Sequence, residues 1–193
     1  FWCAAAVLVV AGCESVEVAE VTTPDSNGHT DIETVASLPE LEAFNSFDFD
    51  FTLTSVEGEQ ISLADYKGKV LIVDMWGTWC PPCRDEIPHF IQLLEKHNEA
   101  GLAIVGINYE RGDPANWADV IKTFVEKFGV TYPCLIGDTE TKNMAGLTAY
   151  PTTLFIDHTG KIRLKIVGYS EYDHLESIVE ALLAEQNTSD EGA

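Results

Sequence analysis

Two cysteines, Cys80 and Cys83, are separated by two residues in the segment Trp79-Cys80-Pro81-Pro82-Cys83. Thiols at this spacing can close a small disulfide ring, and the same spacing also suits half of a zinc site. A metal site is not expected, because the sequence has no second Cys-x-x-Cys pair and its five histidines are scattered. The expected chemistry is thiol–disulfide exchange, in which Cys80 attacks a disulfide and Cys83 resolves the mixed disulfide that forms.

The elements on either side of Cys80 should position this chemistry. The apolar run at 70–73 predicts a central strand buried on both faces, and a helical pattern follows Cys80. Free N–H groups and the helix dipole favour a thiolate at a helix N-terminus, so the pKa of Cys80 is expected to be low. Pro81 and Pro82 fit the first helical positions, which need no hydrogen-bonded N–H. The turn between strand and helix is expected to expose the Cys80 sulfur at the edge of the sheet.

Apolar periodicity predicts the other elements of an α/β domain. Phe47, Phe49 and Phe51 alternate with polar residues, and a turn at Glu57-Gly58 follows, which predicts an N-terminal β-hairpin. Further strands are predicted at 102–107, 132–136, 153–156 and 162–167, and helices at 87–94, 117–128 and 175–182.

A resemblance to a known family is carried by the segment Val73-Asp74-Met75-Trp76-Gly77-Thr78-Trp79-Cys80-Pro81-Pro82-Cys83. It is similar to the active-site strand and loop of the thioredoxin superfamily, and most similar to the membrane-tethered TlpA/ResA-like branch. The resemblance extends over about residues 47–184. It implies a thioredoxin-like fold, with a central mixed β-sheet flanked by helices and an extra N-terminal β-hairpin. It also implies that Pro151 follows a cis peptide bond beside the redox loop, where the backbone of Tyr150 can pair with substrate.

Two acidic residues are candidates for proton transfer. Asp74 precedes Cys80 by six residues and matches a buried aspartate of thioredoxin, although the tethered branch often carries an amide there. A buried carboxyl group has a raised pKa and can shuttle the proton of the resolving thiol. Glu110 lies near the position of an active-site glutamate of the ResA-like branch, one residue out of register. A solvated loop acid is the alternative interpretation of Glu110.

The remaining residues around the motif receive simpler interpretations. Trp79 is expected to form a surface beside the thiol and, with Tyr150 and Pro151, to contact substrate. Cys134 is expected to be a small buried hydrophobic residue, with a regulatory thiol as the alternative. The helix-start residues Arg84, Asp85 and Glu86 are interpreted as a solvated face.

The N-terminal region differs in character from the rest of the chain. An apolar segment at 1–13 ends in Val10-Ala11-Gly12-Cys13, which resembles the lipobox of bacterial lipoproteins, so Cys13 is expected to carry a lipid anchor. An ordinary signal peptide with an incidental Cys is the alternative. The sequence then predicts an acidic flexible linker at 14–45, a folded domain at 46–186 and a polar tail at 187–193.

The formal net charge of −21 argues against nucleic-acid binding, because the chain should repel phosphate. No cofactor is expected. The predicted function is an extracytoplasmic, lipid-anchored thiol–disulfide oxidoreductase that acts as a monomer and as a reductant, for example of the cytochrome c maturation type. Its expected partners are protein thiols and disulfides, with an integral-membrane thiol relay as electron donor. The alternatives are a thiol peroxidase of peroxiredoxin type, although Thr78 lies two residues before Cys80 instead of three, and a non-enzymatic metal-handling module.

Overall fold

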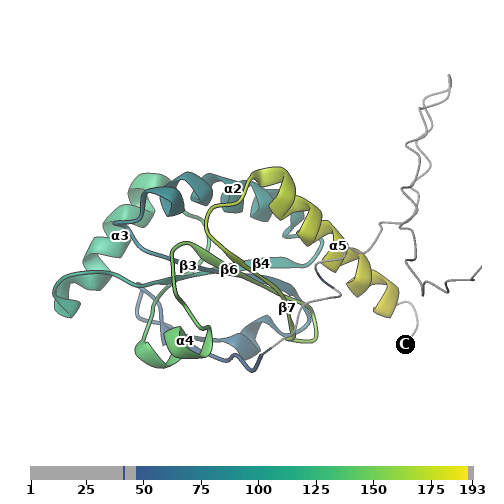
Figure 1. The fold of residues 1–193 in the computed structure, drawn as a ribbon, viewed down its shortest axis with the longest axis horizontal. Helices are drawn as coiled ribbons and strands as arrows, with labels where there is room; N and C mark the ends of the chain where they lie inside the picture. Colours follow the sequence, from purple (N-terminus) through teal and green to yellow (C-terminus); the bar gives the residue numbers. More distant parts are fainter. Residues whose placement is uncertain (1–40, 42–46, 191–193) are drawn as a thin grey trace, which may run out of the picture. The chain divides into compact units, whose positions relative to one another are not determined.

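The computed structural model describes Leu41 and residues 47–190 (Figure 1). The predicted signal segment with Cys13, and the predicted linker apart from Leu41, lie outside the described residues. A five-stranded sheet has the strand order β5-β4-β3-β6-β7. Strand β4 is parallel to β3 and to β5, whereas β6 is antiparallel to β3 and β7, so the sheet is mixed as predicted. The strands are β3 (Val70–Trp76), β4 (Leu102–Asn108), β5 (Cys134–Ile136), β6 (Thr152–Ile156) and β7 (Ile162–Val167).

Strand β3 lies at the centre of the sheet, and all seven of its residues are buried. Because successive side chains of a strand point to opposite faces, β3 contributes to two cores. Ile72 and Trp76 join the core formed with α2 (Pro81–His97), α3 (Trp117–Phe128) and α5 (Tyr172–Asp190). Leu71 and Met75 join the core on the other face, which includes residues of the N-terminal hairpin. Figure 1 shows α2, α3 and α5 over one face of the sheet and α4 (Thr139–Met144) on the other.

The N-terminal hairpin is confirmed, but its first strand is shorter than the sequence predicts. Strands β1 (Thr52–Thr54) and β2 (Gln60–Ser62) pair antiparallel around a turn in which Gly58 has φ +93°. Burial alternates from residue 47 onward as expected, yet the ladder with β2 begins only at Thr52. The hairpin also contacts β5, because the Val56 N–H donates a hydrogen bond of 2.9 Å to the Cys134 carbonyl.

The helices follow the predicted order with one addition and two extensions. Helix α2 begins at Pro81 and continues past Pro88 to His97, and α5 continues to Asp190, through residues predicted as a polar tail. The short helix α4 has no apolar period that could have predicted it; its N-cap Asp138 accepts a hydrogen bond of 2.8 Å from the Thr141 N–H. The described residues also form two 3₁₀ helices, η1 (Leu63–Tyr66) and η2 (Pro114–Asn116). Among the described helices, none has the length and hydropathy of a bilayer span.

Candidate active site

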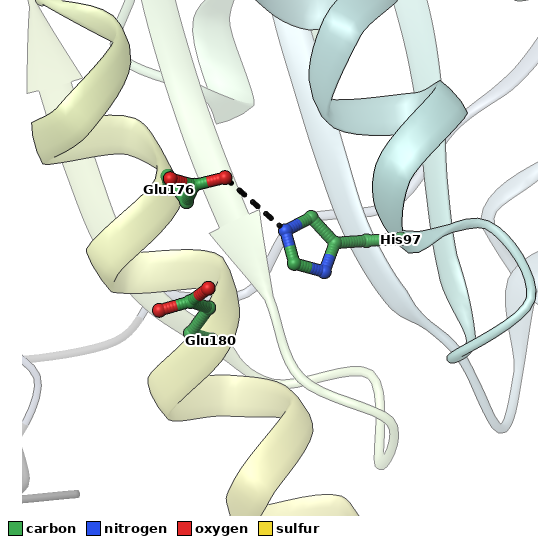
Figure 2. A group of neighbouring side chains, drawn as sticks. All are labelled: His97, Glu176 and Glu180. Atoms are coloured by element: carbon green, nitrogen blue, oxygen red, sulfur yellow. Dashed lines mark ion pairs between the residues drawn. The ribbon is translucent and has the colours of Figure 1, made fainter. Parts of the chain in front are cut away.

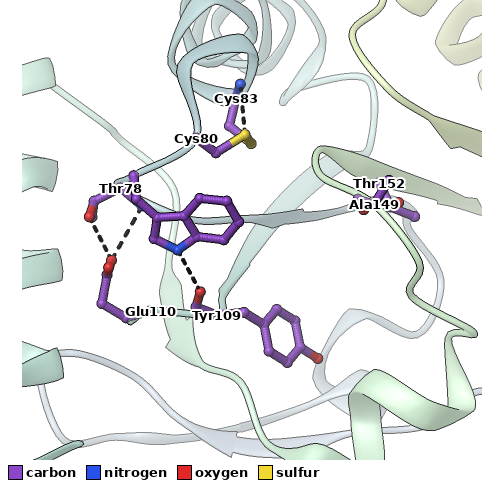
Figure 3. Close-up of a disulfide and its surroundings, with 8 residues drawn as sticks. Thr78, Cys80, Cys83, Tyr109, Glu110, Ala149 and Thr152 are labelled. Atoms are coloured by element: carbon purple, nitrogen blue, oxygen red, sulfur yellow. Dashed lines mark hydrogen bonds between the residues drawn. A yellow bond between two sulfur atoms is a disulfide. The ribbon is translucent and has the colours of Figure 1, made fainter. Parts of the chain in front are cut away.

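Cys80 and Cys83 form a disulfide at the point where β3 leads into α2, with 5.3 Å between their Cα atoms. Cys80 is the N-cap of α2, and its Sγ accepts a hydrogen bond of 3.3 Å from the Cys83 N–H (Figure 3). Pro81 and Pro82 occupy the two positions between them and carry no N–H. The Cys83 N–H is therefore the first backbone donor of the helix that can stabilise negative charge on Cys80.

The structure corrects the expected exposure of the Cys80 sulfur. In the disulfide form Cys80 is 2% exposed and Cys83 is 1% exposed. Both cysteines belong to the core between the sheet and α2, and the half-buried side chains of Trp79 and Tyr150 pack against that core. Exchange with another protein therefore requires a local movement that uncovers the sulfur.

Trp79 is held over the redox loop by three contacts. Its Nε1–H donates a hydrogen bond of 3.0 Å to the Tyr109 carbonyl, and its ring meets Tyr150 edge-on at 5.1 Å between centroids. The guanidinium carbon of Arg111 lies 3.4 Å from the centre of the indole ring, within the range of a cation–π contact. Gly77 permits this arrangement, because a Cβ there would lie 2.5 Å from the indole nitrogen.

The Tyr150-Pro151 peptide bond is cis, as predicted from the family resemblance. The contact between Tyr150 and Trp79 brings this loop beside the redox loop. The Pro151 carbonyl accepts a hydrogen bond of 2.8 Å from the Gly168 N–H. The neighbours of Gly168, Val167 and Tyr169, expose large apolar side chains, so an exposed apolar surface continues from the cis-Pro loop.

Glu110 holds the redox loop in place through hydrogen bonds to Thr78. One carboxylate oxygen accepts hydrogen bonds from the Thr78 hydroxyl at 2.7 Å and the Thr78 N–H at 3.3 Å, as Figure 3 shows. The other oxygen accepts a hydrogen bond of 3.0 Å from the Arg111 N–H. Both oxygens thus bind backbone or side-chain donors of the loops, so the geometry gives Glu110 a positioning role. A groove of about 540 Å³ opens alongside, lined in part by Trp79, Trp117 and Tyr150.

Asp74 is buried, as its match to a buried aspartate of thioredoxin implies. It is 1% exposed, and neither carboxyl oxygen has a hydrogen-bond partner. On β3 it shares a face with Ile72 and Trp76, so it points into the core that contains both cysteines. Burial raises the pKa of Asp74 well above its ordinary value, and the negative charge of Glu86 raises it further.

Glu86 is the site residue that the sequence interpretation missed. It was assigned to a solvated face, but it is fully buried, and its Oε1 accepts a hydrogen bond of 2.8 Å from the Ser170 N–H. Burial raises the pKa of Glu86 from 4.5 to about 7, although the hydrogen bond from Ser170 opposes the shift. The signal was present in the helical period, because Glu86 lies three residues after Cys83 and directly before the buried Ile87.

The two acids are linked electrostatically, since the negative charge of Glu86 disfavours ionisation of Asp74. This linkage extends to Tyr132 and Cys134, whose pKa values are raised by burial first and by the charge of Asp74 second. Cys134 is 2% exposed, which confirms its prediction as a buried residue. A neutral thiol in this position is unreactive, in contrast to one at a helix N-terminus.

Comparison with known proteins places the chain in a family. The model of the AhpC/TSA family matches residues 48–165, which is more than half of the sequence. The chain belongs to the AhpC/TSA family. Among its relatives, it is 36% identical over 134 residues to the thiol-disulfide oxidoreductase ResA of Geobacillus thermodenitrificans (strain NG80-2), covering 67% of this chain and 74% of that protein. It is 34% identical over 119 residues to the thioredoxin-like protein YneN of Bacillus subtilis (strain 168), covering 62% and 68%.

A solved structure shows the same fold. The thiol:disulfide interchange protein, a thioredoxin family protein, of Chlorobium tepidum TLS aligns with a TM-score of 0.64 and 30% identity, covering 73% of this chain and 98% of that one. The thioredoxin-like fold and the ResA-like resemblance are therefore confirmed. The reaction class is confirmed with them: this AhpC/TSA family member is a thiol–disulfide oxidoreductase with a Cys-x-x-Cys pair at disulfide distance.

The raised pKa of Glu86 predicts a loss of stability with rising pH. The folded protein holds this proton more tightly than the unfolded chain, so the stabilising contribution is complete below pH 4.5 and is lost as pH rises through about 7. The loss is on the order of 3 kcal/mol. We expect Glu86→Gln, which keeps an acceptor for the Ser170 N–H, to reduce this loss of stability. The loss is measured as the difference between the free energies of unfolding in urea at about pH 5 and about pH 8.

The exposed neighbour Asp85 provides the matched control, because Asp85→Asn removes an equal charge from the surface of the same helix. Its pH profile should match that of the wild type. A Glu86→Gln profile as steep as the wild-type profile would contradict the assignment of the buried proton to Glu86.

Proposed function

We propose that this chain acts as a reductant of disulfides in proteins outside the cytoplasm. The main support for reduction, as opposed to oxidation, of substrates is the burial of Asp74 and Glu86 in the core that contains Cys83. Disulfide couples become oxidising when the protein stabilises the reduced, thiolate form. Two carboxyl groups behind the resolving cysteine do the opposite, since their charge disfavours a second negative charge on the dithiol. The disulfide form is then favoured, which makes the dithiol a good electron donor.

The catalytic cycle follows from this arrangement. The Cys80 thiolate attacks a substrate disulfide, forms a mixed disulfide and releases the first substrate sulfur, which takes up a proton. The Cys83 thiol then loses its proton to a carboxylate of the Asp74–Glu86 pair and attacks the Cys80 sulfur. The second substrate sulfur leaves and is protonated. The substrate gains two electrons, the Cys80–Cys83 disulfide closes, and an external dithiol must reduce it before the next turnover.

The substrate surface in this proposal consists of Trp79, Tyr150 and Pro151, continued by the exposed Val167 and Tyr169. Support comes from their contacts, since Trp79 meets Tyr150 and the Pro151 carbonyl bonds to Gly168 between the two exposed residues. A protein substrate that covers this apolar surface would displace Trp79 and uncover Cys80.

The direction of the reaction is tested by redox equilibrium. In a glutathione buffer poised at about −220 mV, we expect the pair to be mostly oxidised, as measured by alkylation and mass spectrometry. Catalytic amounts should also accelerate insulin reduction by dithiothreitol without turning over hydrogen peroxide. Cys83→Ser should trap a mixed disulfide through Cys80, and Cys80→Ser should trap none. A mostly reduced pair would contradict the proposed role as a reductant. Turnover of hydrogen peroxide would favour the alternative function of a thiol peroxidase.

The proton-transfer role is tested with Asp74→Asn. We expect resolution of the mixed disulfide to slow by about 10- to 100-fold, because the carboxyl group no longer takes the Cys83 proton. Stability should rise, since a buried and unpaired carboxyl group is removed. Stopped-flow tryptophan fluorescence follows the redox step, and thermal melts follow stability, with Asp85→Asn as the control. Unchanged kinetics across about pH 6 to 9 would leave Asp74 a structural residue.

The location of the protein is part of the same proposal. The lipobox-like Val10-Ala11-Gly12-Cys13 supports a lipid anchor on the extracytoplasmic side of a bacterial membrane, with an integral-membrane thiol relay as the electron donor. We expect the mature protein to begin at a lipid-modified Cys13, as measured by intact mass after extraction from membranes. Cys13→Ser should abolish the modification, and Cys3→Ser should not. An unmodified Cys13, or cleavage at another residue, would exclude the anchor.

A further inference from the structure

An imidazole nitrogen is buried without a hydrogen-bond partner at the end of α2 remote from the disulfide. His97 is the last residue of the helix and is 8% exposed. Its Nε2 lies 3.5 Å from a carboxylate oxygen of Glu176, the contact that Figure 2 marks as an ion pair, and this distance is too long for a hydrogen bond. Buried polar atoms in proteins are usually paired, so an unpaired one directed at a carboxylate points to a ligand.

Two carboxylates on α5 face this nitrogen. Glu176 and Glu180 are one turn apart, so they lie on the same side of the helix, as Figure 2 shows. One ligand atom from each of His97, Glu176 and Glu180 lies within 4.8 Å of the other two. The Glu180 side chain is half-exposed and can rotate to shorten these distances.

Lys96 shows that this pair of carboxylates attracts a cation. Its Nζ lies 2.7 Å from Glu176 and 3.6 Å from Glu180. The Lys96 side chain is half-exposed and flexible, so a divalent ion with higher charge can displace it toward solvent. A metal ion would also bind the His97 Nε2 atom, which has no hydrogen-bond partner in this structure.

The donor set selects the class of metal. One imidazole nitrogen and two carboxylate oxygens suit Zn²⁺ and its first-row neighbours, with water in the remaining position. Ca²⁺ and Mg²⁺ prefer ligand sets made of oxygen alone. We propose that His97, Glu176 and Glu180 bind a divalent transition-metal ion such as Zn²⁺, which links the end of α2 to α5. The sequence predicted no metal site because these residues are far apart along the chain and only the packing of α2 against α5 joins them.

Titration with Zn²⁺ tests the proposal. The full chain is used with the Cys80–Cys83 disulfide closed and other accessible thiols alkylated, because free thiolates bind zinc themselves. Isothermal calorimetry should detect a site in the wild type that is weakened roughly tenfold or more in His97→Gln and Glu180→Gln. Lys96→Met should bind Zn²⁺ more tightly, because it removes the competing cation. Zn²⁺ should also raise the melting temperature of the wild type and not that of Glu180→Gln.

The exposed His174, on the same helix as both glutamates, gives the matched control. His174→Gln should retain wild-type affinity. Glu180→Gln alters a half-exposed side chain and will fold even if the buried His97→Gln does not. Wild-type Zn²⁺ affinity in Glu180→Gln, or no zinc-dependent difference between the wild type and this variant, would overturn the proposal.

Discussion

The junction between β3 and α2 is the constraint on which the redox site depends. A helix that begins at the end of a buried central strand leaves its first N–H groups unpaired, and Cys80 is the residue that meets them. The two prolines remove the earlier donors, so the first one available belongs to Cys83, the partner cysteine. One backbone group thus stabilises charge on the attacking sulfur and fixes the resolving residue beside it. The loop before the junction is in turn held by Glu110 through Thr78.

The two ends of the disulfide experience opposite electrostatic influences. The helix N-terminus favours a thiolate at Cys80, whereas the buried Asp74 and Glu86 disfavour additional negative charge in the core near Cys83. This difference separates the roles of the cysteines without any difference in their chemical type. Burial of the two carboxyl groups lowers the stability of the fold, because they occupy core positions that apolar side chains could fill.

Sequence patterns predicted the parts of this structure that local chemistry determines. The buried run of β3 and the cysteine motif each carry a strong local signal, whereas the cis bond before Pro151 was implied by the family resemblance. Glu86 was misassigned because a charged residue at a helix start usually faces water, and its burial depends on Ser170, which is distant in sequence. The burial of Cys80 was missed for a related reason, since Trp79 and Tyr150 meet only in the folded chain. Tertiary packing thus decided the features that local patterns could not.

The attachment of the N-terminal hairpin to β5 affects how the edges of the main sheet can pair with other chains. The hydrogen bond from Val56 to Cys134, and the bridge between Ser55 and Leu135, occupy backbone groups on one border of the main sheet. At the opposite border, β7 carries Arg163 and Lys165, and charged side chains discourage strand addition by other chains. One edge of the sheet that carries the redox loop is therefore partly covered by the hairpin, and the other carries charged side chains that disfavour strand addition.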